Sequence, residues 1–281
     1  MIASAEAAPR RRESGLTRAW RAVRRQTLTV YAILAFAYLM LPIAVVILFS
    51  FNQPAGRFNY VWEGFTLENW RNWDGIPGLS DSMVLSLEIA AIASVVATVL
   101  GTLIALALVR YRFRGRGATN IFIFLPMSSP EIVLGASLLT LFLSLRFQFG
   151  FSTIVIAHVM FCVSYVVVTV KARLVGFDRH LEEAAMDLGA NEWTTFRKVT
   201  LPLIAPAILA ALLLCFALSI DDFVITYFNA GSEVTFPLFV WGAARVGAPA
   251  QVNVLGTVIF LVAVIGMLAN VLFQIRRSRS A

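Results

Sequence analysis

Charged residues are scarce in this chain: only 14% of its 281 residues are Asp, Glu, Lys or Arg. A soluble domain of this size carries about a quarter charged residues. Apolar residues instead make up 59% of the chain, and the mean hydropathy is +0.80. The composition therefore excludes an ordinary soluble domain, and we expect one membrane domain with lipid as its main solvent.

Residues that carry enzymatic chemistry are also rare. Cys162 and Cys215 lie inside apolar runs, and we expect both to be small buried side chains without a disulfide between them. His158 and His180 stand apart from each other, and we expect both to be structural. The chain lacks a G-x-x-x-x-G-K-[ST] loop, an H-E-x-x-H motif and a nucleophile elbow. We therefore expect no catalytic site, no bound metal or cofactor, and no ATP hydrolysis by this chain.

Long apolar runs are what the sequence has in abundance. Six of them reach about the 20 residues that a helix needs to cross the hydrocarbon core of a bilayer. They predict an all-α fold with six transmembrane helices, at residues 28–50, 84–108, 119–143, 152–171, 203–225 and 253–273. Residues 1–27 then form an Arg-rich N-terminal tail, and residues 274–281 form a short C-terminal tail.

Small residues recur at every fourth position of the second span, at Ala93, Ala97, Gly101 and Ala105. This spacing places them on one face of a helix. Small side chains allow two helix backbones to approach closely, so we predict that this face packs against another helix.

Lys and Arg are divided unequally between the connections of the six spans. Nineteen fall on the side of the N-terminus, and four fall on the other side, at Arg57, Arg71, Arg146 and Arg245. Basic residues accumulate on the cytoplasmic side of membrane proteins. We therefore expect both termini to be cytoplasmic, and we attribute the net charge of +7 to orientation in the membrane rather than to nucleic-acid binding.

Acidic residues occur inside the predicted spans, where each costs roughly 2.5–3.5 kcal/mol on insertion scales. Glu131 lies near the middle of the third span, beside Pro126 and Pro130, which interrupt helical hydrogen bonding. Such a site is either a helix kink with Glu131 capping the second half, or a broken helix of the kind at which transporters bind cargo; both can hold. Glu88 lies near the outer end of the second span, where solvation or an arginine partner is an adequate explanation.

Further candidates for a transport pathway lie at the outer end of the fifth span. Asp221 and Asp222 are adjacent, and neighbouring residues of a helix point about 100° apart, so we expect only one to face the pathway. We choose Asp222, with the reverse assignment left open. Tyr227, Phe228 and Trp241 follow near the outer mouth. An interfacial aromatic belt is the ordinary explanation for them, and a lining of the pathway is the functional one.

The connection between the fourth and fifth spans, residues 174–201, is long and predicts two short helices. Asp178 can cap the first helix, and Gly189 suits the left-handed position that ends it. Asn191 or Thr194 can begin the second helix. The apolar residues of the first helix share one face, namely Leu181, Ala184, Ala185 and Leu188.

The polar face of this first helix is acidic, with Glu182, Glu183 and Asp187. Helices that lie on a membrane surface carry mainly Lys and Arg on that face. An acidic, short, glycine-ended helix instead favours docking into a groove of a partner protein.

The same segment carries a family resemblance. Glu183-Ala184-Ala185, then Gly189, then Leu201-Pro202 resemble the EAA-x3-G signature of ABC-importer permeases, with its later Leu-Pro. The resemblance implies an all-α, type I ABC-importer permease (MetI-like) fold, in which this segment is the coupling helix that docks on a cytoplasmic ATPase. The resemblance assigns this coupling role to Glu183, Ala184, Ala185 and Gly189. We assign the same role to Glu182, Asp187 and Pro202 because they lie in the same segment.

Within that family, the sequence resembles the spermidine/putrescine permeases most, as a C-type subunit. The stretches that carry this are Ser129–Val133, Leu174–Asp178, Ser219–Phe223, Val246–Pro249 and Val252-Asn253. The resemblance implies a bacterial inner (cytoplasmic) membrane protein with a sister permease, two ATPase subunits that bind ATP and Mg²⁺, and an external substrate-binding protein. It also implies a polyamine cargo, which carboxylates and aromatic cation–π contacts of about 0.5–2 kcal/mol each would suit.

Other readings of the sequence stay open at this point. The same importer class could carry another small polar solute. An ion-coupled secondary transporter could use the acidic residues of the spans as proton sites, although it would leave the coupling signature unexplained, and no inverted repeat supports it. A membrane scaffold would not need carboxylates at mid-membrane depth.

Overall fold

The computed structural model describes residues 15–56 and 58–279. Outside the described residues lie Arg10, Arg11 and Arg12 of the predicted tail, Arg57, Ser280 and Ala281. The regular secondary structure of the described residues is helical, apart from one isolated β-bridge between Asn52 and Phe65. It divides into two compact units: the chain up to Trp73 together with the chain from Pro249 onward, and Asp74–Ala248.

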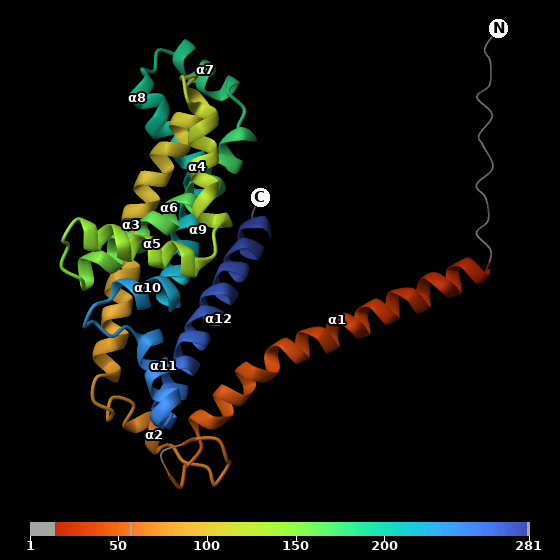
Figure 1. Ribbon diagram of the computed structural model, residues 1–281. Coiled ribbons are helices and arrows are strands. Elements are labelled where there is room, and N and C mark those ends of the chain that lie inside the picture. The colour runs from red at the N-terminus through yellow and green to blue at the C-terminus, as the bar shows by residue number, and fades with distance from the viewer. Residues whose placement is uncertain (1–14, 57, 280–281) are drawn as a thin grey trace. The chain divides into compact units, whose positions relative to one another are not determined.

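The helices are labelled in Figure 1. The first unit contains α1 (Gly15–Ser50), α2 (Glu68–Arg71) and α12 (Ala250–Arg279). The second unit contains α3 (Leu79–Arg110), α4 (Arg116–Ser128), α5 (Glu131–Ser144), α6 (Phe151–Val175), α7 (His180–Asp187), α8 (Glu192–Thr195), a π-helical turn (Phe196–Thr200), α9 (Leu201–Ile220), α10 (Val224–Asn229) and α11 (Phe236–Val246). Helix α1 begins at Gly15 and so includes part of the predicted tail.

Five stretches of the described residues are helical, long and apolar enough to cross a membrane: Gln26–Ser50, Leu79–Arg110, Phe151–Val175, Glu192–Ile220 and Ala250–Leu268. They correspond to the first, second, fourth, fifth and sixth predicted spans. The fifth ends at Ile220 rather than at residue 225, because the chain leaves the helix after Ile220 and begins α10 only at Val224.

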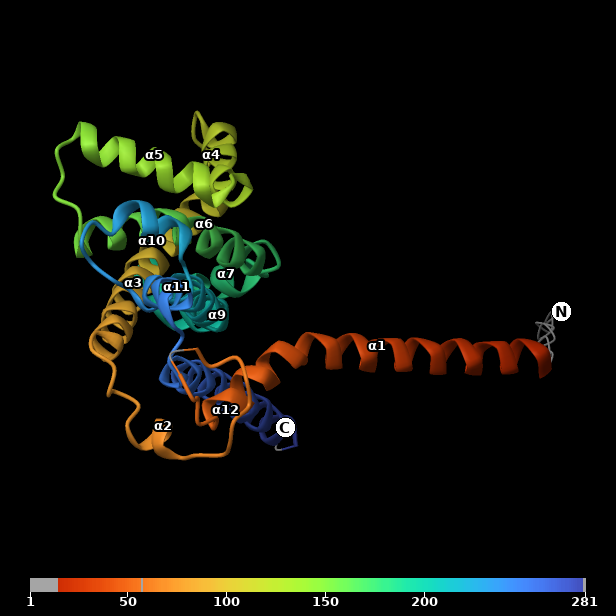
Figure 2. The ribbon, with the colours of Figure 1, turned by 60° about the horizontal axis from the view of Figure 1, so that its bottom comes forward.

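The third predicted span, residues 119–143, is not one helix. Helices α4 and α5 meet at 109° across Ser129 and Pro130, either as a broken span or as a re-entrant pair. A proline disfavours helical conformation at the residue before it, and the backbone of Ser129 is extended, with φ −83° and ψ 142°. Figure 2 shows α5 turning away from the direction of α4. The predicted break is therefore confirmed at Pro130, while Pro126 lies inside α4.

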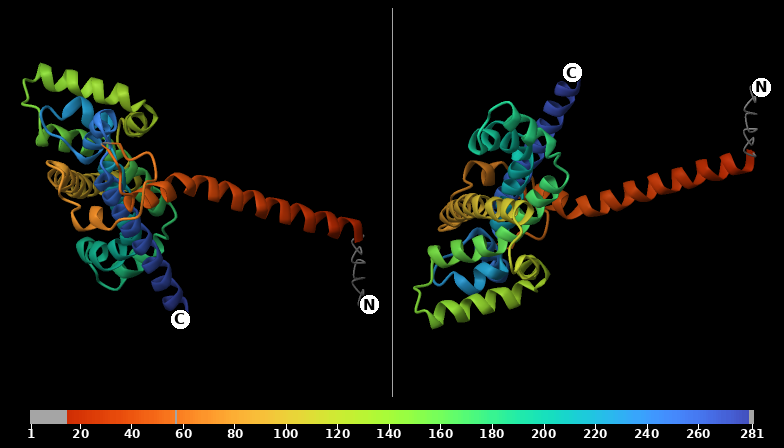
Figure 3. Two further views of the ribbon diagram at one scale, coloured as in Figure 1. Left: turned by 90° about the horizontal axis from the view of Figure 1, so that it is seen from below. Right: turned by 90° about the horizontal axis from the view of Figure 1, so that it is seen from above.

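The core of the second unit lies between α3, α6 and α9, which pack side by side (Figures 1 and 3). All four small residues of α3 are buried, as predicted: Ala93, Ala97, Gly101 and Ala105. A Cβ atom added at Gly101 would lie 2.6 Å from Cβ of Val166 and 3.1 Å from the carbonyl oxygen of Val163. The predicted close helix contact is confirmed, and its partner is α6.

Buried asparagines organise the connection that follows α1 in the first unit. The amide of Asn52 donates to Oδ1 of Asn59 at 2.6 Å and to the carbonyl of Val61 at 2.7 Å. The amide of Asn69 in turn donates to the carbonyl of Asn52 at 2.7 Å. Because each buried amide finds partners, these hydrogen bonds fix the loop without a regular sheet.

Candidate functional site

The first candidate site is the segment that contains α7 and α8. Helix α7 ends at Asp187, and Gly189 follows two residues later with a φ of +90°, in the left-handed region. A Cβ there would meet no atom within 4 Å, so conformation rather than space calls for glycine. The amide of Ala190 closes the helix end by donating to the carbonyl of Ala185 at 3.1 Å. The predicted glycine stop is confirmed.

Both helix starts use side chains singled out from the sequence. Asn191 caps α8, since its Oδ1 accepts from the amide of Thr194 at 2.8 Å. Asp178 lies two residues before α7, and its Oδ1 accepts from the amide of His180 at 3.1 Å and from Nδ1 of His180 at 2.6 Å. The side-chain hydrogen bond lowers the pKa of the Asp178 carboxyl and raises the pKa of the His180 imidazole.

Several apolar side chains of this segment are exposed. Leu188 is 90% exposed and Trp193 is 68% exposed, and Leu181 is also exposed. Among the other residues assigned to docking, Glu183, Ala184, Asp187, Gly189 and Pro202 are exposed, and Ala185 is half-buried. An exposed apolar patch with acidic neighbours is the kind of surface that a partner protein covers.

Glu182 differs from its neighbours because it turns toward its own chain. Its carboxylate pairs with Arg110, at the end of α3, and accepts a hydrogen bond from the hydroxyl of Thr200. Its side chain is only 15% exposed. Sequence reasoning counted Arg110 only as an orienting charge and did not single out Thr200.

The second candidate site lies where α9 ends and α10 begins. The Oδ2 atom of Asp222 accepts from both the amide and the hydroxyl of Thr226, each at 2.8 Å. His158, on α6, places its Nε2 atom 3.3 Å from the same oxygen and 2.9 Å from Oγ1 of Thr226. Its Nδ1 atom lies 2.7 Å from Oγ of Ser219. These contacts satisfy the Asp222 carboxylate inside the chain, and its side chain is only 6% exposed.

Asp221 has the opposite environment. It is exposed, at the C-terminal end of α9, directly before the helix break. The two adjacent carboxylates therefore differ in environment: Asp222 is bonded within its own chain, and Asp221 is exposed. The choice between Asp221 and Asp222 as the pathway residue stays a prediction.

Glu131 lies in the first turn of α5, directly after Pro130, and is exposed. A carboxylate there faces the unpaired amides and the positive end of the helix dipole. The same helix packs tightly on α10, since a Cβ at Gly135 would lie 2.8 Å from Cδ2 of Phe228. Glu88, by contrast, is exposed on α3 and forms no hydrogen bond or ion pair with any residue that the structure describes.

Aromatic rings connect α10 and α11 in a continuous series. The ring of Phe223 lies 5.2 Å from that of Trp241 and 5.6 Å from that of Tyr227, and Tyr227 lies 5.9 Å from Phe228. The guanidinium of Arg245 sits 4.6 Å from the centre of the Trp241 ring. The three aromatic residues predicted near the outer mouth are thus brought together by Phe223, and one of their rings already faces a cation.

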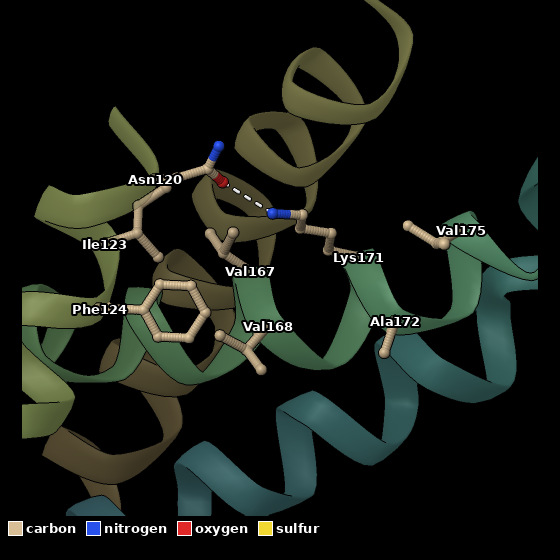
Figure 4. A pocket seen from close by; sticks show the side chains of 8 residues that line it. All are labelled: Asn120, Ile123, Phe124, Val167, Val168, Lys171, Ala172 and Val175. Atoms are coloured by element: carbon tan, nitrogen blue, oxygen red, sulfur yellow. Dashed lines mark hydrogen bonds between the residues drawn. The ribbon is translucent and has the colours of Figure 1, made fainter. Parts of the chain in front are cut away.

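Two further observations concern possible ligand sites: one cavity, and the absence of a metal-binding group among the described residues. A cavity of about 280 Å³ lies between α4 and α6, lined mainly by apolar side chains, with Lys171 donating to Oδ1 of Asn120 at 2.7 Å (Figure 4). None of the candidate site residues lines it. Among the described residues, no group of three or more His, Cys, Asp or Glu side chains could hold a metal ion.

Five membrane-length helices, a bent helix pair and an exposed segment between α6 and α9 define a membrane protein of several spans. Residues 97–279 match the model of the family described as binding-protein-dependent transport system inner membrane component. The chain belongs to this family, and it is a multi-pass inner-membrane protein.

The curated relatives are permeases. The chain is 41% identical over 240 residues to the spermidine/putrescine transport system permease protein PotC of Escherichia coli strain K12, covering 84% of this chain and 89% of the relative. It is 39% identical over 253 residues to the putrescine transport system permease protein PotI of the same strain, covering 85% and 88%.

Solved structures agree on the fold. A bacterial ABC transporter involved in the import of the acidic polysaccharide alginate matches with a TM-score of 0.62 at 19% identity, covering 93% of this chain and 97% of the other. The MetNI methionine ABC transporter matches with a TM-score of 0.56 at 16% identity, covering 71% and 95%. The all-α fold predicted from the sequence, of the type I ABC-importer permease class, is confirmed.

Proposed function

We propose that this chain is the transmembrane permease subunit of an ATP-driven importer for polyamines such as spermidine and putrescine. It pairs with a sister permease, two ATPase subunits and an external substrate-binding protein. The observation that carries the proposal is the 41% identity to a spermidine/putrescine permease over 84% of this chain. The ATPase subunits bind ATP and Mg²⁺, and this chain contributes the pathway and the docking segment.

The exposed segment from α7 to α8 supports the coupling part of the proposal. Glu183 and Asp187 present charge, and Leu188 and Trp193 present apolar surface, outside the chain's own core. Closure of the ATPases would displace this segment, and the permease would then alternate between inward-facing and outward-facing states.

The second site supports a cationic cargo. A linear polyamine carries ammonium groups separated by apolar methylene groups. Exposed Asp221 and Glu131 supply carboxylates, while Tyr227, Phe228 and Trp241 supply ring faces. Ring faces attract ammonium groups by about 0.5–2 kcal/mol each, and more strongly where water is excluded.

The coupling test uses uptake and complex formation together. The variants Glu183→Lys and Gly189→Leu are expected to abolish uptake of radiolabelled spermidine by cells that express the whole transporter, while the permease still inserts in the membrane. Co-purification with the ATPase should fall in parallel. Glu63→Lys, an exposed charge reversal in the connection after α1, serves as the control and should keep the complex. Normal uptake and a normal complex in both coupling variants would contradict the proposal.

The cargo test is a competition experiment. Unlabelled spermidine and putrescine should displace labelled spermidine from uptake, whereas an amino acid or a sugar in excess should not. Displacement by another small polar solute, with no effect of polyamines, would keep the importer and reject the polyamine cargo.

The proposed orientation has its own test. Cysteines introduced at exposed Tyr60 and at Ser232 should react with an impermeant reagent added outside the cell, and one at Arg114 should not. Background labelling should be low, since Cys162 and Cys215 are both 0% exposed. The opposite pattern would reverse the topology and move α7 away from the ATPase.

A further inference from the structure

The docking helix α7 is fastened to its own chain at a single charged junction. Glu182 of α7 pairs with Arg110, the last residue of α3, and also accepts from the hydroxyl of Thr200. The guanidinium of Arg110 closes the triangle by donating to Oγ1 of Thr200 at 3.1 Å. Three helical elements, α3, α7 and the π-helical turn, therefore meet at one carboxylate; we call Arg110, Glu182 and Thr200 the Glu182 junction.

The junction is sheltered. Thr200 is 0% exposed, and the side chains of Glu182 and Arg110 are 15% and 32% exposed. Ion pairs that are partly withdrawn from water hold their geometry better than surface pairs, which are screened and mobile. A second contact supports the same attachment, since Arg179, directly before α7, donates to the carbonyl of Val109 at 3.2 Å.

Thr200 occupies a special position in the backbone. It ends the π-helical turn Phe196–Thr200, in which the amide of Leu201 bonds to the carbonyl of Phe196, five residues earlier. Single π-helical turns are rare and are found frequently at functional sites. Helix α8, this turn and α9 form one continuous helical run, Glu192–Ile220, and Asp221 follows directly at its far end.

The geometry points to a role for the Glu182 junction in transmission rather than in docking. We propose that Arg110, Glu182 and Thr200 are positioning residues that pass a displacement of α7 to α3 and α9. This inference rests on the proposed function, in which α7 and α8 dock on the ATPase. It divides the acidic face of α7 in two: Glu183 faces the partner, and Glu182 faces the permease's own helices.

The chemistry of Glu182 supports this division. Its Oε1 atom accepts from both the guanidinium of Arg110 and the hydroxyl of Thr200, and the side chain is only 15% exposed, so little of the carboxylate surface is open to a partner protein. Without the junction, α7 would still dock on the ATPase, but its contacts with α3 and with the start of α9 would be weaker. ATP hydrolysis would then continue, and less cargo would be imported per ATP.

The experiment measures cargo imported per ATP hydrolysed, in vesicles that contain the complete transporter. Arg110→Gln and Thr200→Val are expected to lower this ratio on the order of 2- to 30-fold, the range by which residues along a coupling path change an energetic coupling. Thr200→Ser keeps the hydroxyl and should restore wild-type coupling, whereas Thr200→Val keeps only the shape. Arg114→Gln, an exposed arginine in the same loop, is the matched control and should have no effect.

A charge swap provides an independent check. Arg110→Glu alone should uncouple transport, and the double variant Arg110→Glu with Glu182→Arg should recover part of the ratio. Loss of the ATPase from the complex in Arg110→Gln or Thr200→Val would overturn the inference, because it would make the junction a docking element. An unchanged ratio in both variants would overturn it too. If Glu183→Lys still abolishes uptake in either case, the proposed function survives and only the junction's role fails.

Discussion

Asp221 and Asp222 are adjacent in the chain, but substitutions at the two positions are expected to have different effects. The perturbation is the same for both, Asp to Asn, which keeps the shape of the side chain and removes its charge. Asp222 is held inside the chain by Thr226 and His158, whereas Asp221 is exposed at the end of α9. We expect Asp222→Asn to damage the fold of the helix break and Asp221→Asn to damage transport.

The magnitude for Asp222 follows from its contacts. Its Oδ2 accepts two hydrogen bonds at 2.8 Å and lies 3.3 Å from Nε2 of His158. An asparagine can keep one acceptor toward the amide of Thr226, but it loses the charge and at least one of the remaining contacts. Hydrogen bonds to charged groups are worth about 1.5–3 kcal/mol each, so a loss of about 2–4 kcal/mol in the free energy of unfolding is expected.

For Asp221, the expected loss of stability is below about 0.5 kcal/mol, as for other exposed substitutions. Its effect on transport is larger, because removing one partner of a desolvated charge pair costs roughly 2–5 kcal/mol. Polyamine uptake should therefore fall at least about 30-fold, since every 1.4 kcal/mol is a factor of ten.

The assay compares thermal stability of the purified transporter with uptake of labelled spermidine. Asp222→Asn should lower the unfolding midpoint by about 4–16 °C, and Asp221→Asn should leave it unchanged. Thr226→Val removes the same hydrogen bond from the other side, so its effect should combine with that of Asp222→Asn less than additively. Equal stability of the two Asp variants, or a normal uptake rate for Asp221→Asn, would refute the assignment of roles.

Two further predictions concern other parts of the chain. Gly101→Ala places a Cβ at 2.6 Å from Val166 and should cost about 1–3 kcal/mol through overpacking of α3 against α6, measured as a lower unfolding midpoint; Gly117→Ala, with open space around it, should have no such effect. The Asp178–His180 contact should protect the start of α7 from hydrogen exchange most strongly between about pH 4 and pH 6.5. Its contribution is lost above that window as pH passes the raised pKa of His180, and below it as pH passes the lowered pKa of Asp178; Asp178→Asn should abolish both trends.

Local rules in the sequence predicted several features well. The four-residue spacing from Ala93 to Ala105 predicted a close helix contact, because small side chains at that period can serve little else in a membrane helix. Gly189, Asn191 and the break at Pro130 were predictable for a similar reason: each acts through its own backbone or through residues three or four positions away.

Pairings over long sequence distances could not be predicted in this way. Arg110 and Glu182 are 72 residues apart, and His158 and Thr226 are 68 residues apart. Helical periodicity identifies the face on which a residue lies, but not which helix covers that face. His158 did carry a signal, since a lone ionisable residue in a membrane span demands a partner. That partner, Asp222, became evident only once α6 was placed against the start of α10.

The tight fit of Gly101 against Val166 limits where the protein can move. Close-packed helix pairs switch between discrete arrangements and do not slide gradually, and here any shift along the contact would drive backbone into side chain. We therefore expect helices α3 and α6 to move together as a rigid body during a transport cycle. We expect motion to be concentrated where the helices are interrupted, at Ser129-Pro130 and between Ile220 and Val224. Pairs of spin labels on α3 and α6 should keep their separation through the cycle, while pairs that straddle either interruption should report the change.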